Sequence, residues 1–347
     1  MKRLLITGAA GFIGSNFLHY IRDQEPELSL INVDKLTYAG NLENLQDFEE
    51  DDNYHFLRAD VTDEEKLAPL FEEGIDAVVN FAAESHVDRS IEDSAPFVRT
   101  NVEGTRTLLE LAREYGVDSF VQVSTDEVYG ELGESGKFTP QTSLDPSSPY
   151  SASKAAADLL AGSFYQTFDV PVTLVRCSNN YGPYQFPEKL IPLMIMKALA
   201  EEELPVYGDG TNVRDWIYVK DFCRGIHRAL ADGEPGEIYH FGGDCELTNL
   251  EVVKRILDYL DRPESLISFV EDRPGHDFRY AMDFSKTTDQ LGWQPEVEFE
   301  DGLSRTIDWY LDNRGWVQNV QSGEYRDYYE RSYESRSDWL QEVLPSS

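Results

Sequence analysis

The sequence predicts an α/β protein with a doubly wound parallel sheet and a smaller mixed α/β lobe. Short apolar segments alternate with longer amphipathic ones through the first half of the chain, and a glycine-rich turn follows the first apolar segment. The alternation breaks up after about residue 177. Strands and helices that alternate at this spacing form a parallel sheet covered by helices on both faces.

Strands are predicted where short apolar runs occur, and helices in the amphipathic stretches between them. The predicted strands are residues 3–7, 29–34, 55–58, 77–82, 119–124 and 172–176, with a later one near 238–241. The predicted helices are residues 13–23, 64–72, 96–115 and 150–168. We therefore expect residues 1–177 to form the sheet domain, with a segment near 213–245 returning to it. Residues 178–347 should form mainly the second lobe and a C-terminal tail.

Composition restricts the function classes. The chain has 347 residues, with 65 Asp or Glu against 30 Lys or Arg, and a formal net charge of −35. A surface this acidic repels nucleic-acid phosphates, so we expect no nucleic-acid partner. A single acidic run such as residues 49–52 indicates only a solvated face. Acid spread along the whole chain favours a protein that works in concentrated salt, where screening suppresses self-repulsion.

The three cysteines, Cys177, Cys223 and Cys245, are irregularly spaced and form no CxxC pair. This pattern argues against a disulfide or zinc framework and favours a reducing cytoplasm. The sequence also has no HExxH motif, so we predict no metal site. No apolar stretch reaches the ~18 residues that a membrane-spanning helix needs, so we expect no membrane partner.

The turn after the first predicted strand carries three glycines. Gly8 and Gly11 permit a tight turn and a close approach of a pyrophosphate to the backbone, and Gly14 lets the following helix pack on the sheet. The first N–H groups of that helix and its dipole favour the phosphates. Because the motif lies between a strand and a helix, it predicts a Rossmann-type dinucleotide site.

Acidic residues at the ends of the next two strands bear on the choice of dinucleotide. Asp34 can accept hydrogen bonds from the adenosine ribose hydroxyls and would repel a 2′-phosphate. NAD is therefore favoured over NADP, the alternative being that Asp34 caps a loop. Asp60, followed by Val61, could approach the adenine or equally cap the helix at residues 63–72.

Tyr150 and Lys154 are four positions apart, on one face of a predicted helix. An unperturbed tyrosine, with a pKa of ~10, is a poor base at neutral pH. A nearby ammonium and a positively charged nicotinamide both favour the phenolate, so we expect the pKa of Tyr150 to be lowered. A YxxxK pair alone is more often a surface pair, but after a dinucleotide motif it predicts a base for a hydroxyl proton.

Ser124, Thr125, Asp126 and Glu127 follow an apolar strand. Ligands of open α/β sheets bind beyond the carboxyl ends of strands, which places these hydroxyl and carboxyl groups at the crevice. A simple oxidation needs only the tyrosine and lysine. Two additional carboxyls suit a second reaction in which one acts as acid and the other as base. The alternative is a helix-capping loop.

Nine segments give the chain a family resemblance. They are TGAAGFIGS, VDKLTYAGN, FAAESHVDRSI, TNVEGT, VSTDEVYG, PYSASKAA, SNNYGPYQFPEKLIP, YGDGTNVRDWIYVKD and RPGHDFRYA, and LGWQP and SGEYRDYYERSY beyond them are similar as well. On these segments the chain resembles the extended short-chain dehydrogenases/reductases and, within them, the dTDP-glucose 4,6-dehydratases. The segments TGAAGFIGS and PYSASKAA are common to the whole superfamily. The Thr-Asp-Glu triplet and the FAAESHVDRS and SNNYGPYQFPEKL runs are much more particular.

The resemblance implies a three-step reaction on dTDP-glucose with bound NAD. Tyr150 takes the C4 hydroxyl proton while hydride leaves C4, with Thr125 orienting the hydroxyl and Lys154 holding the nicotinamide ribose. Glu127 then removes the C5 proton, and Asp126 protonates the departing C6 hydroxyl. The hydride returns to C6 and a proton to C5, so a 4-keto-6-deoxy sugar forms and NAD⁺ is regenerated.

The resemblance also implies two sets of binding residues. The cofactor contacts would be Gly8, Gly11, Phe12, Ile13, Gly14, Asp34, Lys35, Leu36, Thr37, Asp60, Val61, Phe81, Ala82, Ala83, Thr100, Ser124, Tyr150, Lys154 and Asn180. The substrate contacts would be Ser85, Thr125, Asn179, Lys189, Leu190, Pro205, Val206, Tyr207, Arg214, Asn249, Arg273, His276 and Asp277. Arg214, Arg273 and Lys189 suit a diphosphate. Arg214 could instead pair with Asp215, and Lys189 could equally be a surface residue.

The predicted helices 96–115 and 150–168 carry broad apolar faces. By analogy with the superfamily, we expect them to pair across a two-fold axis into the four-helix bundle of a homodimer.

The alternative functions within the superfamily are those of a UDP-hexose 4-epimerase, a UDP-glucuronate decarboxylase and a UDP-sugar 4,6-dehydratase. Of these, an epimerase has no need of the adjacent acid pair. A regulator that binds NAD without turnover should lack Tyr150 or Lys154, and the chain has both.

Overall fold

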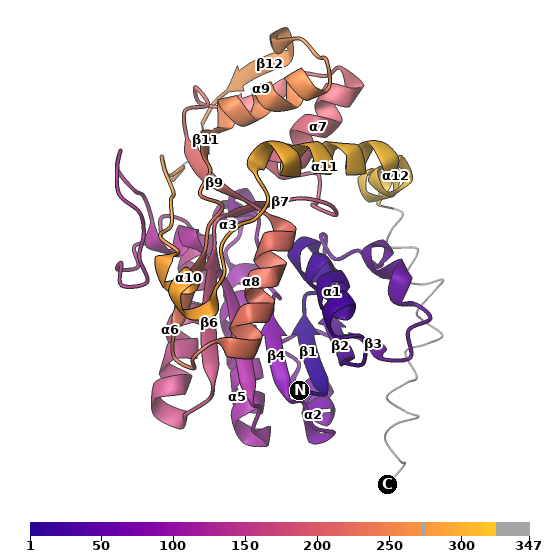
Figure 1. Ribbon diagram of the computed structural model, residues 1–347, viewed down its shortest axis with the longest axis vertical. Helices are drawn as coiled ribbons and strands as arrows, with labels where there is room; N and C mark the ends of the chain where they lie inside the picture. Colours follow the sequence, from indigo (N-terminus) through magenta and orange to yellow (C-terminus); the bar gives the residue numbers. More distant parts are fainter. Residues whose placement is uncertain (273–274, 324–347) are drawn as a thin grey trace.

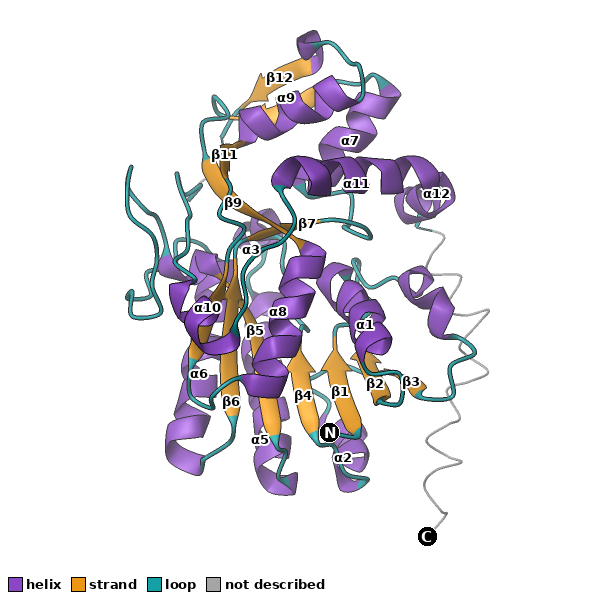
Figure 2. Ribbon diagram, viewed as in Figure 1, coloured by secondary structure: helices purple, strands orange, loops and turns teal. Residues whose placement is uncertain are grey.

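The computed structural model describes residues 1–272 and 275–323 (Figures 1 and 2). Within these residues, the centre is a seven-stranded parallel sheet with the order β10-β6-β5-β4-β1-β2-β3. Its strands are β1 (Arg3–Thr7), β2 (Ser29–Asp34), β3 (Tyr54–Arg58), β4 (Ala77–Asn80), β5 (Ser119–Thr125), β6 (Val172–Cys177) and β10 (Ile238–Phe241). The predicted Rossmann-type doubly wound fold is confirmed, because the strand order extends in both directions from β1.

Helices cover both faces of the sheet (Figure 1). One face carries α1 (Phe12–Gln24) and α8 (Val219–Asp232), and the other carries α2 (Glu64–Glu72), α5 (Thr105–Tyr115) and α6 (Pro149–Phe168). Side chains of a strand alternate between the two faces. Leu4 and Ile6 of β1 therefore pack with α1 and α8, whereas Leu5 packs with the helices opposite. Burial on both faces explains why these strands are apolar throughout.

The helix predicted at residues 96–115 is interrupted. The structure has a short α4 (Ala95–Phe97), a π-helical segment (Val98–Gly104), and only then α5. Within the π turn, Asn101 Nδ2 donates to the Glu84 carbonyl at 3.1 Å and to Ser153 Oγ at 2.8 Å. The π turn thus ties the segment after β4 to α6. π-turns inside helices are frequent at functional sites.

The second lobe lies beyond the carboxyl ends of the sheet strands (Figure 2). In the described part of the chain it holds a three-stranded sheet, β11-β9-β7, and a two-stranded one, β12-β8. Its elements are β7 (Asn179–Tyr181), α7 (Leu190–Ala200), β8 (Leu204–Tyr207), β9 (Val213–Tyr218), β11 (Glu246–Thr248), α9 (Asn249–Tyr259), β12 (Ile267–Val270), α11 (Phe299–Asp312) and α12 (Arg314–Ser322). Tyr181, Trp216 and Ile256 belong to the separate apolar core of this lobe.

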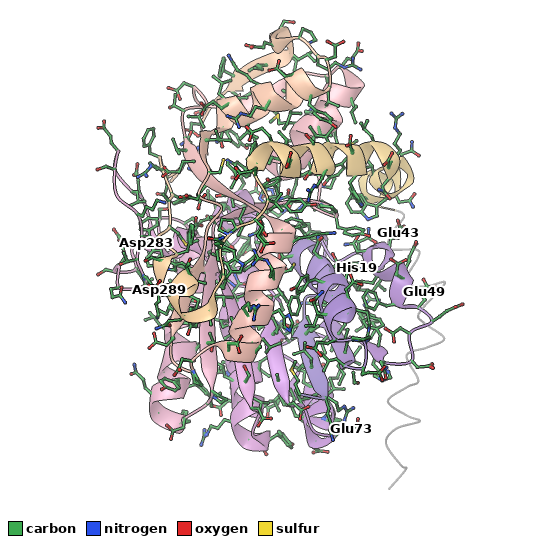
Figure 3. All side chains as sticks on the ribbon, in the orientation of Figure 1. His19, Glu43, Glu49, Glu73, Asp283 and Asp289 are labelled. Carbon is green, nitrogen blue, oxygen red and sulfur yellow. The ribbon has the colours of Figure 1, made fainter. Side chains whose placement is uncertain are left out.

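Short helices lie between the longer elements. They are the 3-10 helices η1 (Leu42–Phe48), η3 (Asp126–Tyr129) and η4 (Glu264–Leu266), and the helices α3 (Val87–Glu92) and α10 (Ser285–Leu291). Trp316 Nε1 of α12 donates to Asn44 Oδ1 at 2.7 Å, and Asn44 Nδ2 donates to the Ala10 carbonyl at 3.0 Å. Asn319 of α12 also donates at 3.1 Å to the carboxylate of Glu43, the residue labelled in Figure 3. These bonds fix α12 against the glycine turn.

Candidate active site

A pocket of about 320 Å³ lies at the carboxyl ends of β1, β2, β4, β5 and β6. Every predicted cofactor residue except Leu36 lines this pocket. Leu36 has a φ of 57°, its N–H donates to Asp34 Oδ1 at 2.8 Å, and its side chain packs on the apolar core. The resemblance predicted that Lys35, Leu36 and Thr37 after β2 all contact the cofactor. In the structure Leu36 turns inward, and only Lys35 and Thr37 line the pocket.

The glycine turn fits a backbone that a phosphate approaches closely. Gly8 has a φ of +71°, and a Cβ there would lie 2.8 Å from the Ala82 nitrogen. A Cβ on Gly14 would lie 2.5 Å from the Gly8 carbonyl oxygen. Helix α1 begins at Phe12 after Gly11, which provides no side-chain cap. The first N–H groups of a helix have no acceptor within it, so those of α1 can serve a pyrophosphate at the pocket wall.

Asp34 is held rigidly at the end of β2. Its Oδ2 accepts from the Ala10 N–H at 3.0 Å and its Oδ1 from the Leu36 N–H at 2.8 Å. Burial raises the pKa of Asp34, and these two N–H donors counteract part of that shift. The fixed carboxyl lines the pocket and can accept from the ribose hydroxyls of a dinucleotide.

Asp60 lines the same wall but is engaged differently. Lys35 Nζ lies 2.7 Å from Asp60 Oδ2, and the Thr62 N–H donates to its Oδ1 at 3.0 Å. Burial raises the pKa of Asp60, but the bonds from Lys35 and Thr62 outweigh it and the pKa lies below its usual range. Helix α2 is capped by Asp63, which accepts from the Lys66 N–H. The side chain that caps this helix is therefore not Asp60.

The acid pair lies where β5 ends and η3 begins. Thr125 Oγ1 accepts from the Glu127 N–H at 3.3 Å, so Thr125 is the N-cap of η3. Asp126 is 2 % exposed, and its Oδ2 has no hydrogen-bond partner among the described residues. Burial raises the pKa of Asp126 well above its usual range, and the carboxyls of Glu127 and Asp215 raise it further. A carboxyl that keeps its proton at neutral pH can act as a proton donor.

Tyr150 and Lys154 lie near the start of α6, buried on the wall of the same pocket. Lys154 Nζ donates to the Val123 carbonyl at 2.7 Å, and burial lowers the pKa of this lysine. Burial raises the pKa of Tyr150 well above 10, and the carboxyls of Glu127 and Asp126 add to the shift. The expected lowering of the Tyr150 pKa is therefore wrong for the protein alone. In the protein alone, burial and the carboxyls dominate the pKa of Tyr150, and a positively charged nicotinamide beside the phenol would act in the opposite direction.

Four of the predicted substrate residues also line the pocket: Ser85, Thr125, Asn179 and Lys189. Lys189 Nζ donates to the Ser85 carbonyl at 2.9 Å, so Lys189 belongs to the site. The side-chain oxygens of Asn179, Asn180 and Gln185 are buried and have no hydrogen-bond partner among the described residues. Buried polar atoms are rarely left without a partner, so these oxygens indicate that a ligand completes the wall.

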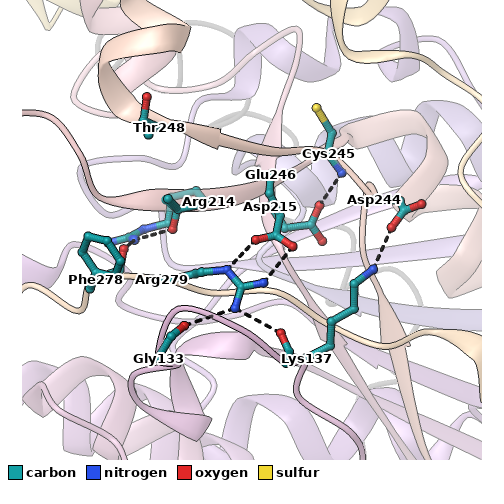
Figure 4. A network of polar contacts seen from close by, with 12 residues as sticks. Gly133, Lys137, Arg214, Asp215, Asp244, Cys245, Glu246, Thr248, Phe278 and Arg279 are labelled. Atoms are coloured by element: carbon teal, nitrogen blue, oxygen red, sulfur yellow. Dashed lines mark hydrogen bonds and ion pairs between the residues drawn. The ribbon is translucent and has the colours of Figure 1, made fainter.

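The other predicted substrate residues do not line this pocket. They are Leu190, Pro205, Val206, Tyr207, Arg214, Asn249, His276 and Asp277, and Arg273 lies outside the described residues. Arg214 donates to the carbonyls of Val213 at 2.7 Å, Asp277 at 2.9 Å and Phe278 at 3.2 Å (Figure 4). The carboxylate of Asp215 accepts from the N–H groups of Gly243 and Cys245.

Some wall residues escaped the sequence analysis. They are Val33, Ala39, Gly40, Ala59, Glu84, Val123, Cys177, Ser178, Gln185, Phe186 and Glu188. Cys177 is paired in register with Thr125, so the neighbouring strand end could have revealed it. Ser178, Gln185 and Phe186 belong to the SNNYGPYQFPEKL run.

In the described residues, no three His, Cys, Asp or Glu side chains group to hold a metal ion, and no helix could span a membrane.

Known proteins share both the sequence and the fold. The family model described as GDP-mannose 4,6 dehydratase matches residues 5–306. A dTDP-glucose 4,6-dehydratase from Xanthomonas campestris pv. campestris is 52 % identical over 345 residues, covering 94 % of this chain and 98 % of that protein. The "Low-salt glycan biosynthesis protein Agl12" of Haloferax volcanii is 51 % identical over 308 residues, covering 89 % of this chain and 98 % of that protein.

Among solved structures, DesIV, a dTDP-glucose 4,6-dehydratase from Streptomyces venezuelae with NAD and dTDP bound, is 49 % identical with a TM-score of 0.89. The match covers 92 % of this chain and 99 % of that one. The fold and the pocket thus define an NAD-dependent enzyme of the extended short-chain dehydrogenase/reductase class, with an acid pair beside the tyrosine and lysine. The chain belongs to the dTDP-glucose 4,6-dehydratase family.

Binding of NAD⁺ to the cofactor-free protein should release a proton from Tyr150. The raised pKa keeps Tyr150 protonated at neutral pH, and a positive nicotinamide beside it favours the phenolate. Affinity for NAD⁺ should therefore increase with pH, with release of up to about one proton per site. Calorimetry in two buffers of different ionisation enthalpy measures this number, and Tyr150→Phe should abolish the release. Buffer-independent heats for the unmutated protein would contradict this account.

Proposed function

We propose that this protein is an NAD-dependent dTDP-glucose 4,6-dehydratase that forms dTDP-4-keto-6-deoxyglucose. The observation that carries the proposal is a single pocket lined by the buried carboxyl of Asp126, the carboxyl of Glu127, and the Tyr150–Lys154 pair. Oxidation of a hexose hydroxyl uses only the last pair. Removal of water across C5 and C6 also needs a proton acceptor and a proton donor, which the two carboxyls supply.

The dinucleotide half of the pocket fits NAD. Gly8 and Gly11 would let a pyrophosphate approach the backbone, Gly14 allows close packing of α1 on the turn, and Asp34 can accept from ribose hydroxyls and would repel a 2′-phosphate. Lys154 and Asn180 would hold the remainder of the cofactor. When bound, NAD accepts a hydride from C4 and returns it to C6. Because this cycle has no net oxidation, the cofactor stays bound between turnovers.

The protein groups move the protons. Tyr150 takes the proton of the C4 hydroxyl, which Thr125 orients. The 4-keto group makes the C5 proton acidic, and Glu127 removes it. Asp126, whose pKa is raised by burial, gives its own carboxyl proton to the C6 hydroxyl, which leaves as water. A proton then returns to C5.

The enzyme superfamily includes related reactions on nucleotide sugars. UDP-hexose 4-epimerases need no acid pair beside the tyrosine, so the buried Asp126 argues against that function. A UDP-glucuronate decarboxylase and a UDP-sugar 4,6-dehydratase would act on uridine nucleotides. Thymine and uracil differ by one methyl group, worth ~1 kcal/mol in a pocket. The names and the bound dTDP of the similar proteins support the thymidine nucleotide.

Single-turnover kinetics with dTDP-glucose separates the roles of Glu127 and Tyr150. Glu127→Gln should reduce the bound nicotinamide normally and then stall, because no base removes the C5 proton. Tyr150→Phe should prevent the reduction, because no group takes the C4 hydroxyl proton. General-base loss typically costs ~10²–10⁴-fold in rate. Nicotinamide absorbance follows the first step, and product formation follows the second.

Glu134→Gln, the same change at an exposed position, is the matched control and should behave as the unmutated enzyme. Normal turnover by Glu127→Gln would remove Glu127 from its role as the base. Equal loss of reduction in the Glu127 and Tyr150 variants would indicate a damaged pocket instead of two separate roles.

We also infer that the protein is a homodimer through a four-helix bundle. Val98 of the π-helical segment is 51 % exposed and Leu159 of α6 is 66 % exposed, and the two segments pack against each other. Apolar side chains this exposed on neighbouring helices are typical of an interface. Leu159→Asp should shift the protein to monomer in sedimentation velocity. Phe269→Asp, at a similarly exposed apolar residue of β12, should not. A monomeric unmutated protein would contradict the inference.

The acidic surface supports a further proposal, that the protein works in a cytoplasm of high salt. With a formal net charge of −35, self-repulsion is strongest at low ionic strength. The thermal midpoint should therefore be several degrees higher in multimolar KCl than in dilute buffer. Sucrose, which stabilises by exclusion without screening charge, separates the two effects and should raise the midpoint less. Equal midpoints in dilute buffer and KCl would contradict adaptation to salt.

A further inference from the structure

A polar network is buried beneath the floor of the pocket. Asp158 of α6 accepts through Oδ2 from Ser124 Oγ at 2.9 Å and from Arg176 Nε at 2.8 Å. Arg176 Nη1 donates to the Tyr129 hydroxyl at 2.5 Å, and that hydroxyl lies 2.6 Å from His240 Nε2. Asp158, Arg176, Tyr129 and His240 are only 2 %, 3 %, 2 % and 1 % exposed. We call these four residues, together with Ser124, the buried polar network.

The direction of each hydrogen bond in the network is fixed. His240 Nδ1 lies 3.0 Å from the carbonyl oxygen of Asp283, the residue labelled in Figure 3, and a carbonyl only accepts. Nδ1 therefore carries the proton. Burial lowers the pKa of His240 to about 3, so the ring is neutral and Nε2 accepts from Tyr129. The Tyr129 oxygen in turn accepts from the Arg176 guanidinium, which is always charged.

The network contacts both halves of the catalytic machinery. Tyr129 is the last residue of η3, whose first two residues are Asp126 and Glu127. Asp158 lies one helical turn beyond Lys154 on α6, and two turns beyond Tyr150. Ser124 and Arg176 are paired in register on β5 and β6. One continuous set of hydrogen bonds thus connects the turn that carries the acid pair to the helix that carries the tyrosine and lysine.

The turn that carries the acid pair is a four-residue 3-10 helix, a form with poor hydrogen-bond geometry, and Gly130 follows it with a φ of 76°. The turn is also held by the Thr125 cap, by a bond from the Asp145 N–H to the Val128 carbonyl at 3.1 Å, and by a small apolar cluster that includes Ala155 of α6. In that cluster the Tyr129 ring stacks on Phe138, with the ring centroids 4.9 Å apart. The hydroxyl of Tyr129 is the group through which the buried polar network attaches to η3.

The composition of the network favours positioning over stability. A buried ion pair is weak evidence for stability, because apolar residues of similar volume often serve the fold as well. Asp158 Oδ1 is also buried without a hydrogen-bond partner among the described residues, which is costly. Buried networks of this kind can instead fix one geometry.

We propose that the buried polar network, acting through the Tyr129 hydroxyl, positions Asp126 and Glu127 against the hexose that Tyr150 and Lys154 hold. Of its members only Ser124 lines the pocket, so the other four are positioning residues. The inference rests on the proposed dehydratase function and adds that the network governs water elimination and leaves the oxidation step unchanged.

Tyr129→Phe tests this directly, because it removes the hydroxyl and keeps the ring against Phe138. Mixed rapidly with dTDP-glucose, the NAD-loaded variant should reduce its nicotinamide at the unmutated rate. Decay of the reduced form should slow on the order of 10- to 100-fold, since a displacement of ~1 Å can cost ~100-fold. Incorporation of solvent deuterium at C5 should slow in parallel. NAD content and thermal midpoint are measured for every variant.

Tyr239→Phe is the matched control. Tyr239 is a fully buried tyrosine on β10 beside His240, and its hydroxyl accepts from the Glu234 N–H, outside the network. This variant should show unmutated kinetics in both phases. His240→Gln keeps an oxygen that can accept from Tyr129 and should retain most of the decay rate, whereas His240→Leu should behave as Tyr129→Phe.

Equal slowing of reduction and decay in Tyr129→Phe would overturn the inference and assign the network to general stability. The inference would also be overturned if the reduced nicotinamide decayed as fast in Tyr129→Phe as in Tyr239→Phe. If the unmutated enzyme failed to reduce its nicotinamide with dTDP-glucose, the proposed function would fail first, and the inference with it.

Discussion

The carboxyl edge of the parallel sheet is the constraint on which the rest of the structure depends. β1, β4, β5 and β6 run in the same direction, so their last residues meet at one edge. That edge brings the glycine turn after β1, the acid pair after β5 and Cys177 at the end of β6 to a single pocket, although they are far apart in sequence. Register then sets the details, since Thr125 lies opposite Cys177 and Ser124 opposite Arg176. The chemistry of the site is thus a consequence of backbone pairing and apolar packing on the two faces.

Burial at that edge controls the protonation of the site. In water, Asp126 would be ionised at neutral pH, but inside the protein its own burial and the neighbouring carboxyls raise its pKa well above the usual range and so favour the protonated form. Three lysines line the pocket, and two of them donate to main-chain carbonyls, Lys154 to Val123 and Lys189 to Ser85. The third, Lys35, pairs with Asp60. Lysines on the wall thus bring cationic groups to this pocket although the overall charge of the protein is strongly negative.

The sequence was sufficient for what depends on local pattern and insufficient for what depends on side chains meeting in space. Periodicity predicted the six strands of the first half and the later strand that became β10, and the glycine turn and the triplet after β5 predicted two walls of the pocket. The π turn at residues 98–104 leaves the apolar periodicity almost unchanged, so it was predicted as ordinary helix. The spacing of Tyr150 and Lys154 suggested direct coupling, but spacing does not reveal that the ammonium binds the Val123 carbonyl. Asp158, Arg176, Tyr129 and His240 come from four different elements, and no spacing rule brings them together.

Isotope tracing gives the most direct test of the central claim, that one pocket oxidises C4 and eliminates water from C5 and C6 of the same hexose. dTDP-glucose carrying deuterium at C4 would be incubated with the protein in concentrated KCl, and the product analysed by mass spectrometry and NMR. The account predicts a 4-keto-6-deoxy sugar with the C4 deuterium recovered at C6, and with a solvent hydrogen at C5. A product inverted at C4 that keeps its deuterium there and its C6 hydroxyl would contradict the account and indicate an epimerase.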